Sequence, residues 1–235
     1  MQLALNLRLR DASSFENFLN GANLEAVARL RALALGPPAP GGSSTLFLWG
    51  ERGSGKTHLL EAACRAAAAV GETPFYLPLR TPGLTPAVLE AIEEASLICI
   101  DDLEQVAGND AWEASLFALY ELSRTHGARL VATAAAPPAR LGCARLDLAT
   151  RLAWGPVYQL HALDDREKLE AVRLRAANRG LELSDEVLNY ILRRYPRDLA
   201  SLFALLDRID AAALARRRRV TIPFLRDLEE TPPRT

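Results

Sequence analysis

The sequence predicts an α/β fold, in which a parallel five-stranded sheet flanked by helices is followed by a small all-α domain. Three observations support this prediction. Short apolar runs alternate with helical patterns through the first two thirds of the chain, a glycine-rich loop joins the first run to a helix, and strand patterns stop after Leu163. Strand–helix alternation is typical of a parallel sheet that is covered on both faces.

The elements of the α/β part follow one another in a regular order. Residues 24–35 predict a helix, because their leucine and valine residues fall on one helical face. The breaker-rich loop 36–44 then leads into the first strand. We expect strands at 45–49, 75–77, 97–101, 130–133 and 157–160, and helices between them at 56–69, 86–95 and 110–126.

The rest of the chain predicts helices alone, at 165–179, 184–194, 198–215 and 222–229. Asp164 and Glu167 have the spacing of a capping box, and Gly180 suits a helix end. We therefore expect an N-terminal arm (1–22), an α/β domain (23–163) and a helical domain (164–235).

Composition excludes several classes of protein. Lys and Arg (28) nearly balance Asp and Glu (29), so the overall charge favours neither nucleic acid nor an anionic membrane. No apolar run reaches the roughly 18 residues of a membrane span, so we expect a cytoplasmic protein with no membrane partner. Cys64, Cys99 and Cys143 lack metal-site spacing and are expected to be free thiols.

A phosphate-binding loop is the strongest motif. GERGSGKT at 50–57 fits GxxxxGK[ST] and stands between a predicted strand and a predicted helix, as the motif requires. Glycines let backbone N–H groups approach phosphate oxygens, and the helix N-terminus adds partial positive charge. We expect ATP or ADP here, bound by Gly50, Gly53, Ser54, Gly55, Lys56, Thr57 and, next to the motif, His58.

Two carboxylates complete the predicted site. The apolar run LICI ends in Asp101 and Asp102, at the carboxyl end of a strand, where ligands bind in such sheets. We expect Thr57 and Asp101 to hold Mg²⁺. Asp102 is placed to orient or deprotonate an attacking water.

A resemblance covers nearly the whole chain. Besides 50–57 and 97–102, it rests on DLATRLAWG at 147–155, LDDREKL at 163–169 and VTIPF at 220–224. These segments resemble AAA+ proteins of the DnaA clade and, within it, the Hda family of regulatory inactivators. The resemblance implies an AAA+ domain with a helical lid, bound to ADP, that stimulates hydrolysis of DnaA-bound ATP and so prevents re-initiation of DNA replication.

The resemblance also implies roles for single residues. Arg151 matches an arginine finger that enters a neighbouring nucleotide site, although a surface ion pair is the alternative. Arg197 matches a second sensor of the bound phosphates, with a solvated arginine as the alternative. Thr133 matches the first sensor, but Ala134 and Ala135 follow where relatives have an acidic residue two positions on. Intrinsic ATPase activity is therefore expected to be weak or absent.

The N-terminal arm resembles a peptide that binds the sliding clamp, the β subunit of DNA polymerase III. Its expected contacts are Gln2, Leu3, Leu5 and Leu7, although Asn6 stands where the family has proline. The alternative is a strand folded back on the chain itself. DNA would then be contacted indirectly through the clamp, without sequence-specific binding, since no helix-turn-helix domain is evident.

Three further points stay open at this stage. The basic run 216–219 either contacts DNA phosphates or is a solvated loop. The chain either acts as a monomer or forms a homo-oligomer. Two other functions compete with regulation of DnaA. One is an autonomous ATPase similar to DnaA or to a helicase loader, in which Asp102 and a neighbour's Arg151 drive turnover. The other is a nucleotide-gated assembly scaffold without chemistry.

Overall fold

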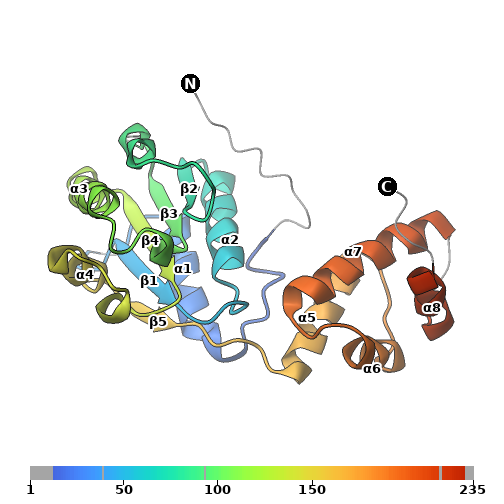
Figure 1. Ribbon diagram of the computed structural model, residues 1–235. Coiled ribbons are helices and arrows are strands. Elements are labelled where there is room, and N and C mark those ends of the chain that lie inside the picture. Colours follow the sequence, from blue (N-terminus) through green and yellow to red (C-terminus); the bar gives the residue numbers. More distant parts are fainter. Residues whose placement is uncertain (1–12, 39, 93, 217–218, 231–235) are drawn as a thin grey trace. The chain divides into compact units, whose positions relative to one another are not determined.

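The computed structural model describes residues 13–38, 40–92, 94–216 and 219–230, which belong to two compact units (Figure 1). The first unit spans Met1–Ala162 and the second spans Leu163–Thr235. The division falls where strand patterns stop in the sequence. None of the helices in the described ranges is long and apolar enough to cross a membrane.

The first unit is built on a parallel sheet of five strands in the order β2-β3-β4-β1-β5. The strands are β1 (Thr45–Trp49), β2 (Pro74–Pro78), β3 (Leu97–Asp101), β4 (Arg129–Ala134) and β5 (Val157–Gln159). This confirms the predicted sheet. Because all strands run the same way, the residues that follow β1, β3 and β4 meet at one edge of the sheet.

Helices cover both faces of this sheet (Figure 1). They are α1 (Leu24–Leu35), α2 (Lys56–Ala69), α3 (Asp110–His126) and α4 (Leu146–Leu152), with short 3₁₀ turns at Gly21–Asn23, Pro86–Ala91, Leu103–Gln105 and Pro138–Arg140. α3 begins where the Asn109 side chain accepts the N–H of Trp112, and Gly127, with φ 73°, ends it.

Side-chain alternation along the strands divides the core into two layers. In β1, Phe47 packs on the α3–α4 side, whereas Leu46 and Leu48 pack on the α1–α2 side. In β3, Ile98 and Cys99 face opposite layers in the same way. The continuous apolar runs that predict buried strands therefore reflect burial on both faces.

One helix prediction in this unit was wrong, and one helix was not predicted. Residues 86–95 were expected to form an α-helix, but the structure has a 3₁₀ helix over Pro86–Ala91. The buried residues Leu89 and Ile92 lie three apart, which matches the 3₁₀ repeat. α4 was not expected, because its seven residues bury only Leu148 and Leu152, too few for a periodic signal.

The described part of the segment expected to be an arm, residues 13–22, packs against α2. Phe15 is buried in the α1–α2 layer. The Ser13 hydroxyl donates to Glu61 at 2.6 Å, and the His58 ring lies 3.0 Å from the Ser14 carbonyl oxygen. The expected clamp contacts Gln2, Leu3, Leu5 and Leu7 lie outside the described residues.

The second unit is helical, as predicted. It contains α5 (Asp165–Asn178), α6 (Asp185–Arg194), α7 (Leu199–Arg216) and α8 (Ile222–Glu230). The Asp164–Glu167 capping box is confirmed, because both reciprocal hydrogen bonds are present, and Gly180 has φ 71° just beyond α5. The core of the unit includes Val172, Ile191, Leu206, Ile209 and Leu225.

Candidate functional site

The glycine-rich loop connects β1 to α2 at the carboxyl edge of the sheet. Gly53 and Gly55 have φ values of 87° and 93°, which favour glycine. Gly50 needs its small size instead, because a Cβ atom there would lie 2.4 Å from the Leu160 carbonyl oxygen. The loop leads directly into the N-terminus of α2, where anions are stabilised.

Lys56 is buried at the start of α2. Its ammonium group donates to the carbonyl oxygens of Gly50 at 2.6 Å and Glu51 at 3.0 Å, which uses two of its three N–H groups. Burial lowers the pKa of Lys56, while the carboxylates of Glu104 and Asp101 oppose that shift. A cation held in this way can donate to a phosphate oxygen through its remaining N–H.

Ser54 supports the same conclusion about the loop. Its hydroxyl oxygen is buried and has no hydrogen-bond partner within the described ranges. A buried hydroxyl without a partner is uncommon and indicates a missing ligand or water. The loop therefore fits a phosphate group.

Asp101 is almost completely buried and binds three hydroxyl groups. Thr57 Oγ1 donates to its Oδ2 at 2.7 Å, Tyr76 donates to the same oxygen at 3.0 Å, and Thr133 donates to Oδ1. Burial, followed by the Asp101 charge, raises the pKa of Tyr76, so that hydroxyl remains a donor. Thr133 also accepts the backbone N–H of Asp102 at 3.2 Å, and so joins the two aspartates.

The pair formed by Thr57 and Asp101 fits Mg²⁺, which prefers oxygen ligands and binds through one or two carboxylates, water and phosphate oxygens. No group of three or more His, Cys, Asp or Glu side chains in the described part of the chain could hold a metal ion. A magnesium ion here would need oxygens from the phosphates.

Asp102 has a conformation and a partner that the sequence did not indicate. Its φ of 60° lies in the left-handed region, where non-glycine residues are uncommon. Arg80, after β2, binds both of its carboxylate oxygens, with Nε to Oδ2 at 2.9 Å and Nη2 to Oδ1 at 3.2 Å. The residue expected to act on water is therefore engaged by a guanidinium in its own chain.

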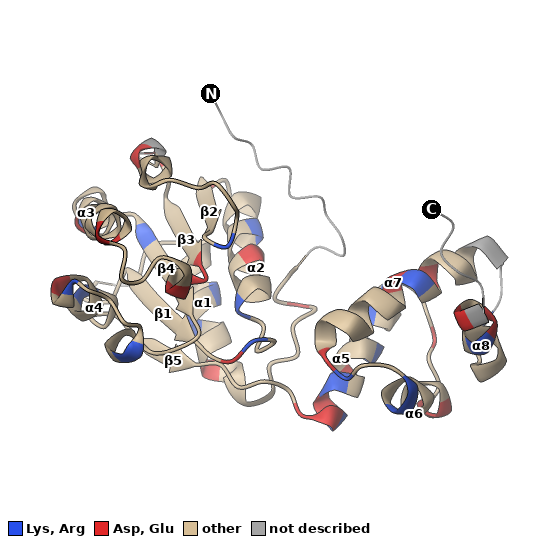
Figure 2. Cartoon of the chain, viewed as in Figure 1, with Lys and Arg blue, Asp and Glu red and all other residues tan. Residues whose placement is uncertain are grey.

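Glu104 is a second residue that sequence analysis missed. Its carboxylate accepts the backbone N–H of Ala135 at 3.1 Å, and its charge acts on Lys56. Figure 2 shows charges of both signs near the ends of β2 and β3. Arg80 and Glu104 follow neighbouring strands of one parallel sheet, and this neighbourhood is set by the strand order, which the sequence alone does not give.

His58 lies beside the loop, and its ring contacts the N-terminal segment. The ring is stacked at a tilt on Phe18, with centroids 5.5 Å apart, and lies near the Ser14 carbonyl. A Cβ atom on Gly55 would lie 2.5 Å from the Phe18 ring. Residues 13–18 therefore form one wall of the phosphate site, a feature that sequence analysis did not identify.

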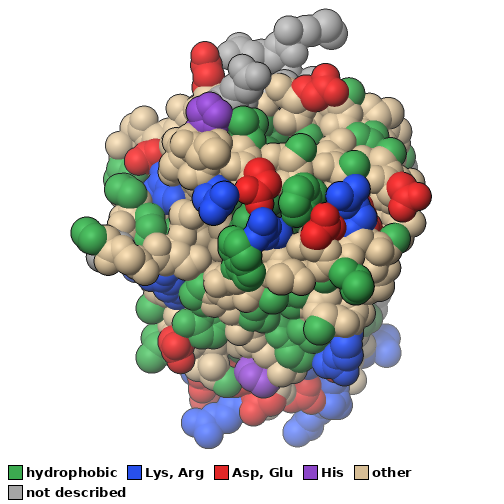
Figure 3. All heavy atoms as spheres, turned by 90° about the vertical axis from the view of Figure 1, so that its left-hand side faces the viewer, with side chains coloured by type: hydrophobic (Ala, Val, Ile, Leu, Met, Phe, Trp, Pro, Cys, Tyr) green, Lys and Arg blue, Asp and Glu red, His purple; other side chains and the backbone are tan. Residues whose placement is uncertain are grey.

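Arg151 lies in the last turn of α4, on the α3–α4 side of the unit. Its Nε is 2.8 Å from a Glu121 carboxylate oxygen, and its guanidinium carbon lies 3.8 Å from the centre of the Trp154 ring. Trp154 and Leu146 are exposed, and Figure 3 shows hydrophobic side chains among charged ones on one side of the molecule. The described contacts of Arg151 are thus with residues of α3 and with Trp154, and not with residues of the chain's own phosphate loop.

Glu113 fixes the segment that precedes α4. It is completely buried, and its carboxylate accepts three backbone N–H groups, from Gly108 at 2.6 Å, Ala144 at 3.0 Å and Arg145 at 2.7 Å. This carboxylate sets where α4 begins and therefore where Arg151 is presented.

Arg197 belongs to the second unit, as predicted, just before α7. It donates to Asp165 at 2.8 Å and to the Leu192 carbonyl oxygen at 3.2 Å. Together with Lys168, the larger cause, it lowers the pKa of the Asp165 carboxyl. The described contacts of Arg197 thus hold it to α5 and α6.

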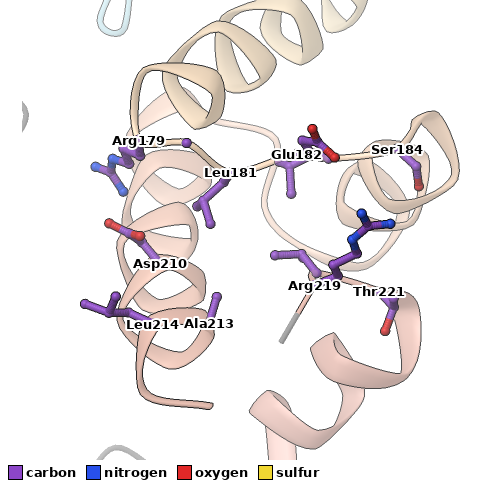
Figure 4. Close-up of a pocket in the computed structure, with 12 residues that line it drawn as sticks. Arg179, Leu181, Glu182, Ser184, Asp210, Ala213, Leu214, Arg219 and Thr221 are labelled. Atoms are coloured by element: carbon purple, nitrogen blue, oxygen red, sulfur yellow. The ribbon is translucent and has the colours of Figure 1, made fainter. Parts of the chain in front are cut away.

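A cavity of about 870 Å³ also lies within the second unit (Figure 4). Its lining includes Arg219 from the basic run and the exposed Leu214. Residues 217–218 of that run lie outside the described part of the chain, so the prediction of a DNA contact is untested.

Two family models match separate parts of the chain. Residues 9–74 match the model of the bacterial DnaA ATPase domain, and residues 165–228 match that of the Hda lid domain. The chain is also similar to domain III of the replication initiation protein DnaA from Thermotoga maritima, with 21% identity, a TM-score of 0.74, and 93% of this chain and 98% of that chain covered.

Other solved structures share the fold. AMPPCP-bound DnaA from Aquifex aeolicus has 20% identity and a TM-score of 0.66, with 85% of this chain and 65% of that chain covered. The RuvB Holliday junction branch migration motor of Thermotoga maritima has 18% identity and a TM-score of 0.61, with 92% and 73% covered. The two family matches support an Hda-like AAA+ protein of the DnaA clade, and the likeness to these solved structures shows that the fold is shared.

Proposed function

We propose that the chain is a DnaA-related regulator of replication initiation, which binds a nucleotide and stimulates hydrolysis of DnaA-bound ATP. The observation that carries the proposal is the Hda-lid match over 165–228 in a chain with a complete phosphate loop. In the cell, conversion of DnaA–ATP to DnaA–ADP would prevent re-initiation.

The nucleotide in the chain's own site is ADP or ATP with Mg²⁺. Lys56 would donate to the β and γ phosphates, Thr57 and Asp101 would hold the metal, and Ser54 would gain the partner that its buried hydroxyl lacks. The metal would neutralise charge on the phosphate oxygens. The pairing of Asp102 with Arg80 favours retention of nucleotide over rapid turnover.

Arg151 is the residue proposed to act on DnaA. The described contacts of its side chain are with Glu121, Phe117 and Trp154. None of these residues belongs to the phosphate loop of this chain. An arginine supplied to a neighbouring site stabilises charge on the transferring phosphoryl group and accelerates hydrolysis by about 10³–10⁵. To act there, the Arg151 guanidinium must leave Glu121.

Recruitment is proposed to occur through the sliding clamp. Gln2, Leu3, Leu5 and Leu7 would bind a groove of the clamp as an extended peptide. Because the segment from Ser13 onward is fixed to α2, the peptide would be tethered to the α/β unit by a few residues. Arg197 is proposed to sense the bound phosphates.

The test measures hydrolysis of DnaA-bound ATP in the presence of clamp-loaded DNA. The intact chain is compared with Arg151→Ala and with a chain that lacks residues 1–7. Arg145→Ala is the matched control, because Arg145 also stands at α4 and pairs with a carboxylate, Asp147, at 3.0 Å. We expect stimulation by the intact chain and by the control, and loss with the other two.

An autonomous ATPase is the second candidate, favoured by the presence of Asp102 directly after Asp101. It predicts ATP turnover by the isolated chain that depends on Asp102 and needs neither DnaA nor the clamp. Turnover of this kind, together with no effect on DnaA-bound ATP, would replace the first proposal.

A further inference from the structure

Two side chains hold the Arg151 guanidinium against its own unit. Glu121, from α3, places a carboxylate oxygen 2.8 Å from Nε, and the centre of the Trp154 ring lies 3.8 Å from the guanidinium carbon. α3 and α4 lie side by side in the fold (Figure 1), which brings these residues together although they are distant in sequence. Only 24% of the Arg151 side chain is exposed. The cation is therefore mostly covered by its own chain.

Trp154 is a fixed support for this cation. Its N–H donates to the Arg151 carbonyl oxygen at 3.1 Å, and its ring meets the buried Tyr120 ring edge to face, with centroids 6.4 Å apart. The next residue, Gly155, needs its small size, since a Cβ atom there would lie 2.4 Å from the Thr45 carbonyl oxygen. An indole attracts a guanidinium through its face, whereas the N–H donors of the guanidinium lie in its plane. Stacking on Trp154 therefore does not compete with other acceptors.

Glu121 differs from Trp154, because it engages a donor. The carboxylate oxygen near Arg151 Nε is buried, yet it forms no well-aligned hydrogen bond within the described ranges. The contact is therefore an ion pair held by charge, without the two parallel hydrogen bonds of the strongest arginine–carboxylate pairs. The other oxygen of Glu121 accepts Arg124 Nη2 at 3.2 Å. Glu121 keeps this second cation when Arg151 leaves, which lowers the cost of release.

We propose that Glu121 is a positioning residue, which retains the Arg151 guanidinium on its own chain until the triphosphate of a partner displaces it. This role rests on the proposed function, in which Arg151 stabilises charge on the phosphoryl group of a neighbouring site. A side chain held against α3 cannot extend into another molecule without leaving that contact. Docking therefore selects the released arginine, and the apparent affinity falls in proportion to the fraction that is released.

The test measures hydrolysis of DnaA-bound ATP with clamp-loaded DNA, over a range of concentrations of the intact chain and of Glu121→Gln. Glutamine keeps the shape of the side chain and removes its charge. Partly exposed ion pairs change an equilibrium by about two- to fivefold, so the half-saturating concentration should fall by about that factor. The maximal rate should not change, because the released arginine is the same in both chains. A loss of packing alone would instead raise the half-saturating concentration or lower the maximal rate.

Three further variants test the assignment to Glu121. Glu121→Asp keeps the charge on a side chain one methylene shorter, so its half-saturating concentration should lie between those of the other two chains. Arg151→Ala in the Glu121→Gln background should abolish stimulation, because the gain acts through Arg151. Asp147→Asn is the matched control, since it releases Arg145 from an ion pair of 3.0 Å at the same helix, and it should behave as the intact chain.

A direct measurement of the ion pair needs no partner. The Nε–H NMR signal of Arg151 is identified in the isolated chain by its absence in Arg151→Ala. In Glu121→Gln this hydrogen should exchange with water about two- to fivefold faster than in the intact chain, because the same equilibrium limits its exposure.

An unchanged or higher half-saturating concentration in Glu121→Gln, where the intact chain does stimulate hydrolysis, overturns the role of Glu121 and leaves the proposed function in place. An unchanged exchange rate of the Arg151 Nε–H overturns it without reference to DnaA. A change in the maximal rate alone also overturns it, because Glu121 would then align the arginine and not retain it. The proposed function fails on the intact chain alone, when that chain leaves hydrolysis of DnaA-bound ATP unaffected, and the role of Glu121 then fails with it.

Discussion

Glu113 offers a test of how the surface that bears Arg151 is held in place. Its buried carboxylate is the acceptor for three backbone N–H groups, two of which, from Ala144 and Arg145, lead into α4. In Glu113→Gln one oxygen becomes an amide donor, so at least one N–H loses its acceptor and faces another donor. A hydrogen bond to a charged group contributes about 1.5–3 kcal/mol, and we expect a loss of about 2–4 kcal/mol.

Urea unfolding followed by tryptophan fluorescence measures this loss selectively, because Trp49, Trp112 and Trp154 all belong to the first unit. Hydrogen exchange gives a local reading, since the amides of Ala144 and Arg145 should exchange faster. The control is Glu90→Gln, which replaces an exposed carboxylate. A change below about 0.5 kcal/mol, the range of ordinary surface substitutions, would refute this account of Glu113.

Three further predictions follow from buried or capping groups. Arg129→Met removes a buried guanidinium that contacts Glu72 at 2.6 Å and two carbonyl oxygens. We expect the first unit to lose about 3–5 kcal/mol of stability in the same urea assay, and retained stability would contradict this. Burial raises the pKa of Cys143 to about 11. Because the thiolate is the reactive form, the rate of its alkylation by iodoacetamide should rise about tenfold per pH unit from neutrality toward that pKa. A plateau of the rate near pH 9 would argue against burial of this thiol. Asp164→Ala removes the capping box of α5 and should lower the stability of the second unit by about 1 kcal/mol, measured by circular dichroism, whereas an exposed neighbour such as Arg166→Ala should not.

The parts of the fold that the sequence predicted are those encoded locally. The limits of α2 and α3 could be read from the glycine loop, the Asn109 cap and Gly127, because each signal lies within a few residues of the helix end. The signal for Lys56 and Thr57 in the phosphate loop was equally local, because both belong to one eight-residue motif. Such signals do not depend on how the strands are ordered.

The parts that could not be predicted depend on strand order and on contacts distant in sequence. Arg80 reaches Asp102 only because β2 lies beside β3, and Glu104 reaches Ala135 only because β3 lies beside β4. Glu113 is similar, because an acidic residue in the first turn of a helix predicts a favourable helix dipole and not a buried acceptor for a loop 31 residues away.

The close approach of Gly50 to Leu160 has a mechanical consequence. The Leu160 N–H donates to the Trp49 carbonyl oxygen at 2.6 Å, and the next residue, His161, exchanges two hydrogen bonds with the Asn23 side chain. The second unit begins two residues later, at Leu163. The residues that end the first unit are therefore hydrogen-bonded to the backbone that opens the phosphate loop, so a displacement of that loop would also displace the end of this unit.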